Sequence, residues 1–71
     1  MLLHNDDAVE MEHVVRTLIT VVSLRFEPAV NVMLEAHRKG VALVATTHRE
    51  LAELYVERLK SAGLTATIEP A

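Results

Sequence analysis

The chain contains no cysteine, and its only aromatic residues are Phe26 and Tyr55. Without cysteine it can form neither a disulfide framework nor a zinc site with thiolate ligands, which fits a reducing compartment. With so few aromatic residues, the core must be built from Leu, Val, Ile, Met and Ala, within an apolar content of 51%. Because 71 residues suffice for one small core, we expect residues 1–71 to form a single domain.

Basic residues are also few, and long apolar runs are missing. Seven Lys and Arg stand against ten Asp and Glu, and the net charge is −3. The pair Arg38-Lys39 is too small a basic cluster for a nucleic-acid-binding face. No apolar run approaches the roughly 18 residues of a membrane span, and Met1-Leu2-Leu3 leads directly into charged sequence, unlike a signal peptide. We therefore expect no nucleic-acid partner, no membrane association and no signal peptide.

The first half of the chain predicts one strand and two helices. Residues 2–4 form a short apolar strand that ends at 5–7, because Asn and Asp favour turns. Apolar residues recur at helical spacing through 11–22, which predicts an amphipathic helix. Pro28 suits the first turn of a second helix, and Gly40 after two basic residues marks its end.

The second half predicts a strand, a helix and a strand. Residues 41–46 are apolar and rich in β-branched side chains, which is typical of a buried strand. Thr47 and Glu50 have the spacing of a capping box at the start of a helix that ends at Gly63. Residues 64–69 alternate between apolar and polar, as in a final strand. The order β-α-α-β-α-β predicts an α/β fold of the α+β kind, a two-layer sandwich in which a three-stranded antiparallel sheet packs against three helices.

Polar residues near the N-terminus raise the possibility of a metal site or an enzyme. His4, Asp6, Asp7 and His13 lie within ten residues of one another, but they match neither the HExxH motif nor an EF-hand loop. No Ser, Cys or Lys has the setting of an activated nucleophile. We therefore expect no catalytic residue, no metal ligand and no cofactor.

Each remaining polar or flexible residue also has a purely structural interpretation. Residues 5–7 taken alone are a turn that caps the following helix. His37 taken alone is a residue that suits a helix C-terminus. Met11 and Met33 taken alone are core residues.

Taken together, however, four segments resemble the ClpS family, the adaptors that bind the N-terminal residue of a protein and pass it to a Clp ATPase-protease. The segments read NDDAVEMEHV, VMLEAHRKG, AELYV and LTATIEPA. The family pattern reads roughly NDDxTPMEFV, IMLxVHxxG, AExKV and PLxxTxE in the same order. The interval from Asn5 to His37 also matches, and the resemblance covers nearly the whole chain.

The resemblance implies a site for a free α-amino group and the side chain next to it. Asn5, Asp7 and His37 would supply three hydrogen-bond acceptors to the ammonium, with Asp6 and Val9 in supporting positions. The first side chain, from Phe, Tyr, Trp or Leu, would enter an apolar pocket. By family correspondence, that pocket is lined by Met11, Val14, Met33, Ala36 and Leu64.

The chain departs from the family pattern at several positions. Val9-Glu10 replaces Thr-Pro, and His13 replaces a Phe. Ala36 stands where the family has Val, which leaves more space in the pocket and predicts a preference for aromatic first residues. Leu54-Tyr55 replaces a region with a docking Lys.

The resemblance also implies partners and a location. Glu50 and Glu53 remain as candidates for docking to the N-terminal domain of a ClpA- or ClpC-type ATPase. A monomeric protein of the bacterial cytoplasm or plastid stroma is expected. The alternative is a non-catalytic protein-interaction domain of the same fold that binds no N-degron.

Overall fold

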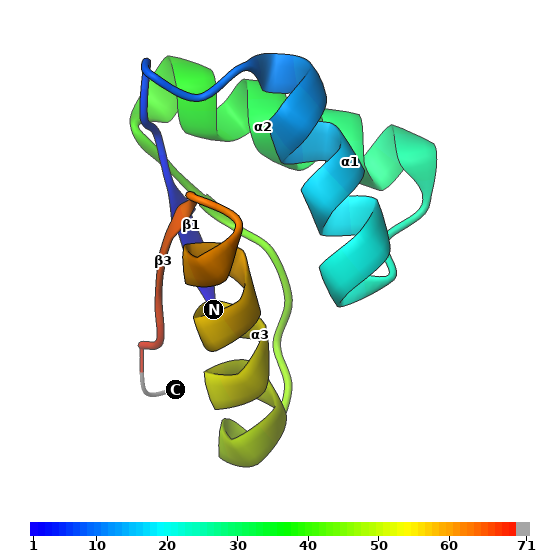
Figure 1. Cartoon of the computed structure of the whole chain (residues 1–71), viewed down its shortest axis with the longest axis vertical. Coiled ribbons are helices and arrows are strands. Elements are labelled where there is room, and N and C mark those ends of the chain that lie inside the picture. Colours follow the sequence, from blue (N-terminus) through cyan, green and yellow to red (C-terminus); the bar gives the residue numbers. More distant parts are fainter. Residues whose placement is uncertain (70–71) are drawn as a thin grey trace.

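The computed structural model describes residues 1–69 as three strands and three helices (Figure 1). The predicted element order and the α+β fold class are both confirmed. The elements are β1 (Leu2–His4), α1 (Met11–Val22), α2 (Phe26–Lys39), β2 (Val41–Leu43), α3 (Arg49–Ser61) and β3 (Thr65–Thr67).

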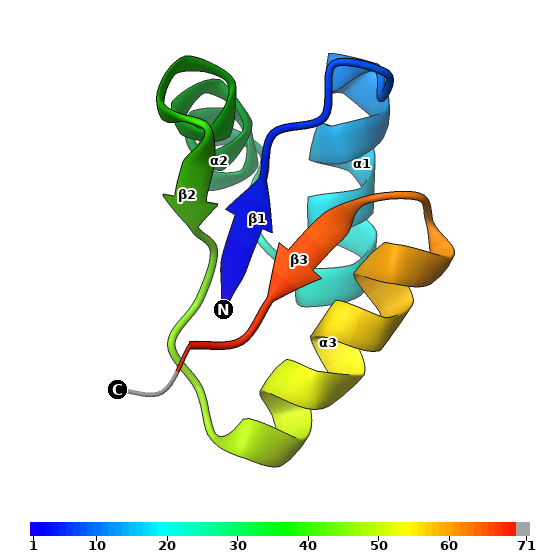
Figure 2. The same cartoon turned by 90° about the vertical axis from the view of Figure 1, so that its left-hand side faces the viewer.

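The first strand is the middle of the sheet. The strand order is β2-β1-β3, and β1 is antiparallel to both neighbours (Figure 2). Leu3 lies opposite Ala42 and Ala66, and all three are buried. Since successive strand residues point to opposite faces, this row faces the helices and the row beginning at Leu2 faces outward. Figure 1 shows the two layers, with the strands along one side and the helices along the other.

The core is aliphatic, as the composition predicts. Leu18 of α1 and Leu59 of α3 are fully buried. Tyr55 packs at the margin of the core, and Phe26 lies outside it with 69% of its surface exposed. Apolar burial therefore depends on Leu, Val and Ala side chains between the helices and the inner face of the sheet.

The outer strands are shorter than the sequence predicts. The predicted strands 41–46 and 64–69 are reduced to Val41–Leu43 and Thr65–Thr67. A residue belongs to the ladder only where it has a partner, and β1 offers three residues. The length of the central strand thus limits both neighbours.

The predicted capping box at Thr47 and Glu50 is wrong. Helix α3 begins at Arg49, and its N-cap is His48, which makes no side-chain capping hydrogen bond. A capping box needs the N-cap residue and the third helical residue. Because the helix starts one residue later than predicted, Glu50 occupies the second helical position and cannot complete the motif.

The predicted end of α2 at Gly40 is confirmed, whereas α3 ends at Ser61, two residues before the predicted Gly63. Gly40 ends α2 in the left-handed conformation with φ of 87°, and its N–H donates to the Ala36 carbonyl at 2.8 Å. Glycine adopts this conformation without a steric penalty. α2 is also the longest helix, with 14 residues, or about 21 Å. Within residues 1–69, no helix is both long and apolar enough to cross a bilayer.

We predict that Leu59→Ala lowers the free energy of unfolding by about 2–5 kcal/mol, because it removes buried methyl groups and leaves a cavity. Leu54→Ala on the same helix is the matched control, since Leu54 is 39% exposed and should lose clearly less. Urea unfolding followed by circular dichroism measures both. Equal losses in the two variants would contradict this description of the core.

Candidate functional site

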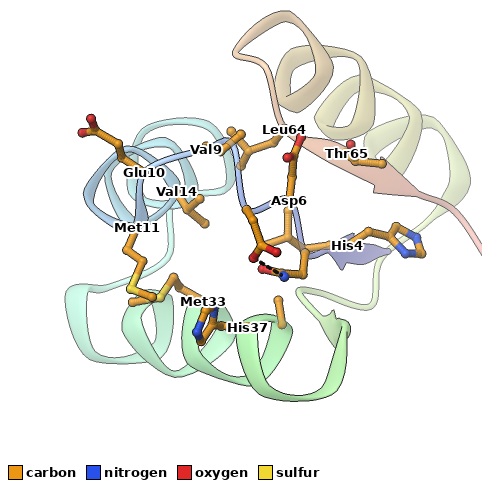
Figure 3. Close-up of a pocket in the computed structure, with 14 residues that line it drawn as sticks. His4, Asp6, Val9, Glu10, Met11, Val14, Met33, His37, Leu64 and Thr65 are labelled. Atoms are coloured by element: carbon orange, nitrogen blue, oxygen red, sulfur yellow. Dashed lines mark hydrogen bonds between the residues drawn. The ribbon is translucent and has the colours of Figure 1, made fainter.

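A pocket of about 220 Å³ opens at one end of the sheet (Figure 3). Its residues come from β1 and the loop after it, the start of α1, the C-terminal half of α2, and the segment that leads into β3. They are Leu3, His4, Asn5, Asp6, Asp7, Val9, Glu10, Met11, Val14, Met33, Ala36, His37, Leu64 and Thr65.

Sheet topology explains why these distant segments meet. Because β1 is antiparallel to both neighbours, its last residue lies beside the first residues of β2 and β3: His4 pairs with Val41 and with Thr65. The end of α2 comes immediately before β2, and Leu64 comes immediately before β3. The loop that leaves β1 therefore emerges between these two segments.

The polar side of the pocket is formed by the loop after β1. The Asn5 side-chain amide donates to Asp7 Oδ1 at 3.0 Å. This bond directs the NH₂ group of Asn5 toward Asp7, so the Asn5 carbonyl oxygen stays available as an acceptor. The Asn5 backbone N–H donates to the Gly40 carbonyl at 2.9 Å, which ties the loop to the end of α2. The pair thus presents an amide oxygen and a carboxylate from a fixed position.

Asp6 stabilises the turn itself. Its carboxylate accepts from the Ala8 backbone N–H at 3.0 Å, and its carbonyl accepts from the Val9 N–H at 3.0 Å. The interpretation of residues 5–7 as a cap of α1 is wrong, because the N-cap of that helix is Glu10 and has no side-chain capping bond. The turn ends before the helix starts.

His37 approaches the pocket from α2. It belongs to the last turn of that helix and is exposed. Figure 3 shows its ring at the pocket margin, between Met33 and the Asn5–Asp7 hydrogen bond. An imidazole, an amide oxygen and a carboxylate therefore flank one space.

The interior of the pocket is apolar. Ala36 and Leu64 are buried, with 3% and 4% of their surfaces exposed, and Val14 is half-buried. Met11 from α1 and Met33 from α2 approach each other on the side of the pocket away from Leu64 (Figure 3). Methionine side chains are flexible and polarizable, so this wall can adapt to ligands of different shape.

The structure thus brings all ten residues predicted for the amine and the side-chain pocket into one cavity. It adds four lining residues that the sequence did not indicate, Leu3, His4, Glu10 and Thr65. Leu3 and Thr65 line the pocket because of the strand register, and no local sequence pattern specifies that register. The sequence could have indicated Glu10, because it lies between Val9 and Met11, which were both predicted for the site.

Comparison with known proteins identifies the family of the chain. A model of the family described as ATP-dependent Clp protease adaptor protein ClpS matches residues 1–67. The chain belongs to the ClpS family. This family assignment supports an adaptor role with a Clp protease.

Several ClpS relatives match almost the whole chain. A protein of Synechococcus elongatus named ATP-dependent Clp protease adapter protein ClpS is 54% identical over 71 residues, covering 99% of this chain and 75% of the relative. The ClpS of Gloeobacter violaceus is 44% identical, with 99% and 76% covered. The chloroplastic CLPS1 of Chlamydomonas reinhardtii is 48% identical, with 99% of this chain and 44% of the relative covered.

Two histidines considered for a metal site have separate structural partners in this ClpS protein. His4 Nε2 lies 2.7 Å from the Thr67 hydroxyl across the sheet. His13 Nε2 donates to the Ala62 carbonyl at 2.7 Å and so joins the start of α1 to the turn after α3. Among residues 1–69, no three His, Cys, Asp or Glu side chains form a group that could hold a metal ion.

The two acidic residues considered for ATPase docking lie on α3, outside the pocket. Glu50 and Glu53 are both exposed. Glu53 accepts from Arg49 Nε at 2.9 Å, one turn earlier on the same helix. Such an exposed pair contributes little to stability, so the surface is free to rearrange against a partner.

We predict that Asp6→Ala lowers the free energy of unfolding by about 0.5–1.5 kcal/mol, because the Ala8 N–H loses its acceptor. Asp6→Asn removes the same charge but keeps a side-chain oxygen for the turn, and it should retain most of the stability. Chemical denaturation of both variants measures the difference. If Asn is as destabilising as Ala, the charge of Asp6 matters and the turn hydrogen bond does not.

Proposed function

We propose that this ClpS-family protein binds the free N-terminal residue of N-degron substrates, where that residue is Phe, Tyr, Trp or Leu, and delivers them to a Clp AAA+ unfoldase-protease. Residues 1–71 would act as a single ClpS-like core domain. The observation that carries the proposal is that three acceptors of different kinds and an apolar chamber share one small pocket.

The polar side of the pocket suits an α-ammonium group. An ammonium has three N–H donors, and Asn5, Asp7 and neutral His37 each offer one acceptor. Hydrogen bonds to a charged group are worth about 1.5–3 kcal/mol each. The Asn5–Asp7 bond holds two of the acceptors in place before a ligand arrives, so binding costs less side-chain entropy. Asp6 and Val9 support these residues through the turn.

The apolar chamber suits a hydrophobic first side chain. The whole pocket, with its polar side included, has a volume of about 220 Å³, and a protein cavity of ~150 Å³ accepts benzene. Burying a Leu or Phe side chain is worth about 1.5–3 kcal/mol. A polar or charged first residue would lose hydration without gaining a partner among Met11, Val14, Met33, Ala36 and Leu64.

For the protein partner, we propose the N-terminal domain of a ClpA- or ClpC-type ATPase, contacted through Glu50 and Glu53 of α3. This surface lies outside the degron pocket, so substrate and ATPase can be held at the same time. The names of the relatives support the Clp protease, and their cyanobacterial and chloroplast origins support the bacterial cytoplasm or the plastid stroma as the location. A monomer that binds neither nucleic acid nor membrane fits the acidic composition.

The second candidate is a protein-interaction domain of the same fold without degron binding. The chain departs from the family motif at Val9, Glu10 and Ala36, and these departures favour the second candidate. A fluorescent peptide with N-terminal Phe separates the two, because only the first candidate requires a free amine at the peptide N-terminus.

We predict that acetylating this peptide weakens its binding at least about 100-fold. The acetyl group removes the positive charge and two hydrogen-bond donors, and each 1.4 kcal/mol of lost binding free energy lowers the affinity tenfold. Asp7→Ala should weaken binding of the free peptide and leave the acetylated peptide unaffected. Glu50→Ala, outside the pocket, is the control and should change neither affinity. Equal affinities of free and acetylated peptides would remove Asn5, Asp7 and His37 from the site.

We also predict that Ala36→Val shifts selectivity toward Leu. The two added methyl groups fill space beside the first side chain, at roughly 0.8 kcal/mol for each group brought into contact. A Leu ligand should gain several-fold relative to Phe, which already fills the space and risks overpacking. Fluorescence anisotropy with peptides that differ only in the first residue gives the ratio. An unchanged Leu-to-Phe ratio would show that Ala36 is not part of the wall.

A further inference from the structure

Sulfur in this protein is confined to three methionines, because the chain has no cysteine. In a chain without thiols, the thioether of methionine is the group that a peroxide oxidises. The three side chains differ in exposure: Met1 is buried at 7%, Met33 is half-buried, and Met11 is 45% exposed. Met11 is therefore the methionine most open to an oxidant in solution.

Met11 also belongs to the wall of the degron pocket. Its side chain extends from α1 toward Met33 beside the apolar chamber (Figure 3). A second depression, between α1 and α2 on the outside of the molecule, has the same two methionines in its lining. Met11 thus has the pocket on one side and a surface depression on the other, so a small oxidant reaches it from either side.

The chamber suits the unoxidised form of Met11. A thioether is apolar and polarizable, so it packs well against an aromatic or aliphatic first side chain. The side chains that share the chamber with it are Val14, Met33, Ala36 and Leu64. None of these side chains has an N–H or O–H group to donate. A polar group on this wall would therefore lose its water without gaining a partner when a hydrophobic ligand enters.

Oxidation by a peroxide creates such a polar group. The Met11 sulfur attacks one oxygen of hydrogen peroxide, so that an S–O bond forms and the O–O bond breaks. The sulfur loses two electrons, and the peroxide gains them. The departing hydroxide takes the proton of the transferred oxygen and leaves as water. The product is methionine sulfoxide, a polar side chain in place of a flexible apolar one.

We propose that Met11 is an oxidation site that regulates the degron pocket: the thioether admits a hydrophobic first residue, and the sulfoxide weakens its binding. This inference rests on the proposed function, because the ligand whose binding changes is the N-degron. The modification is reversible, since methionine sulfoxide reductases convert the sulfoxide back to the thioether. Capture of substrates therefore falls when a peroxide is present and returns after reduction.

The test treats the native protein with hydrogen peroxide and follows each methionine by tandem mass spectrometry. Met11 should gain an oxygen atom before Met1 and Met33 do. The protein oxidised at Met11 should bind a peptide with N-terminal Phe about five- to thirtyfold more weakly, as expected for a polar group covered without a partner. Treatment with methionine sulfoxide reductases for both sulfoxide epimers should restore the affinity.

Two variants separate Met11 from the other methionines. Met11→Leu has no sulfur at this position, so peroxide should change its affinity by less than about twofold, whatever the affinity of the untreated variant. Met33→Leu is the matched control, because Met33 lines the same two depressions. Peroxide should still weaken its binding as it does in the native protein.

Other results would overturn the inference in distinct ways. An unchanged or higher affinity after oxidation of Met11, or a loss that persists in Met11→Leu, would exclude Met11 as the regulatory site. Loss of the circular dichroism spectrum of the folded protein on oxidation would attribute the weaker binding to unfolding. Failure of the proposed function looks different, because the untreated protein would then bind the free Phe peptide no better than its acetylated form.

Discussion

The pairing of β1 with a strand on each side is the constraint on which the site depends. Both pairings are antiparallel, so the end of β1 meets the start of β2 and the start of β3 at one edge of the sheet. His37 precedes β2 by a few residues, and Leu64 immediately precedes β3. If β2 or β3 were parallel to β1, the segment that precedes it would lie at the opposite edge of the sheet, and the pocket would not form.

Two short-range interactions then determine the chemistry at this edge. Gly40, in the left-handed conformation, ends α2 and offers its carbonyl to the Asn5 N–H. The Asn5 side chain in turn donates to Asp7. The loop is therefore held to α2 by its backbone while its side chains keep unused acceptors toward the pocket. Backbone bonds fix the position of the loop, and side-chain groups remain available for a ligand.

Local sequence patterns predict the elements but not their limits. Helical periodicity from Met11 onward and the glycine at position 40 identify α1 and the end of α2, since these signals act within a few residues. The outer strands are shorter than their apolar patterns because the length of β1 limits them. The spacing of Thr47 and Glu50 suggested a capping box, but α3 starts one residue later, with His48 as its N-cap. Tertiary context decides such boundaries.

Prediction of the candidate site depended on the resemblance to the ClpS family rather than on local patterns. Asn5, Asp7 and His37 have ordinary structural interpretations when each is considered alone, and no periodicity joins residues 5 and 37. Thr65 and Leu3 depend on strand register, which no local signal specifies. The exposure of Phe26 could not be foreseen, because a helical pattern does not reveal which apolar residues stay uncovered.

A crystal structure of the protein with a bound peptide that begins with Phe tests the central claim most directly. We expect the peptide nitrogen at about 2.7–3.2 Å from the Asn5 carbonyl oxygen, an Asp7 carboxylate oxygen and a His37 ring nitrogen, with the phenyl ring against Ala36 and Leu64. A peptide bound with its N-terminus in solvent, or with its first side chain outside the chamber, would contradict the account.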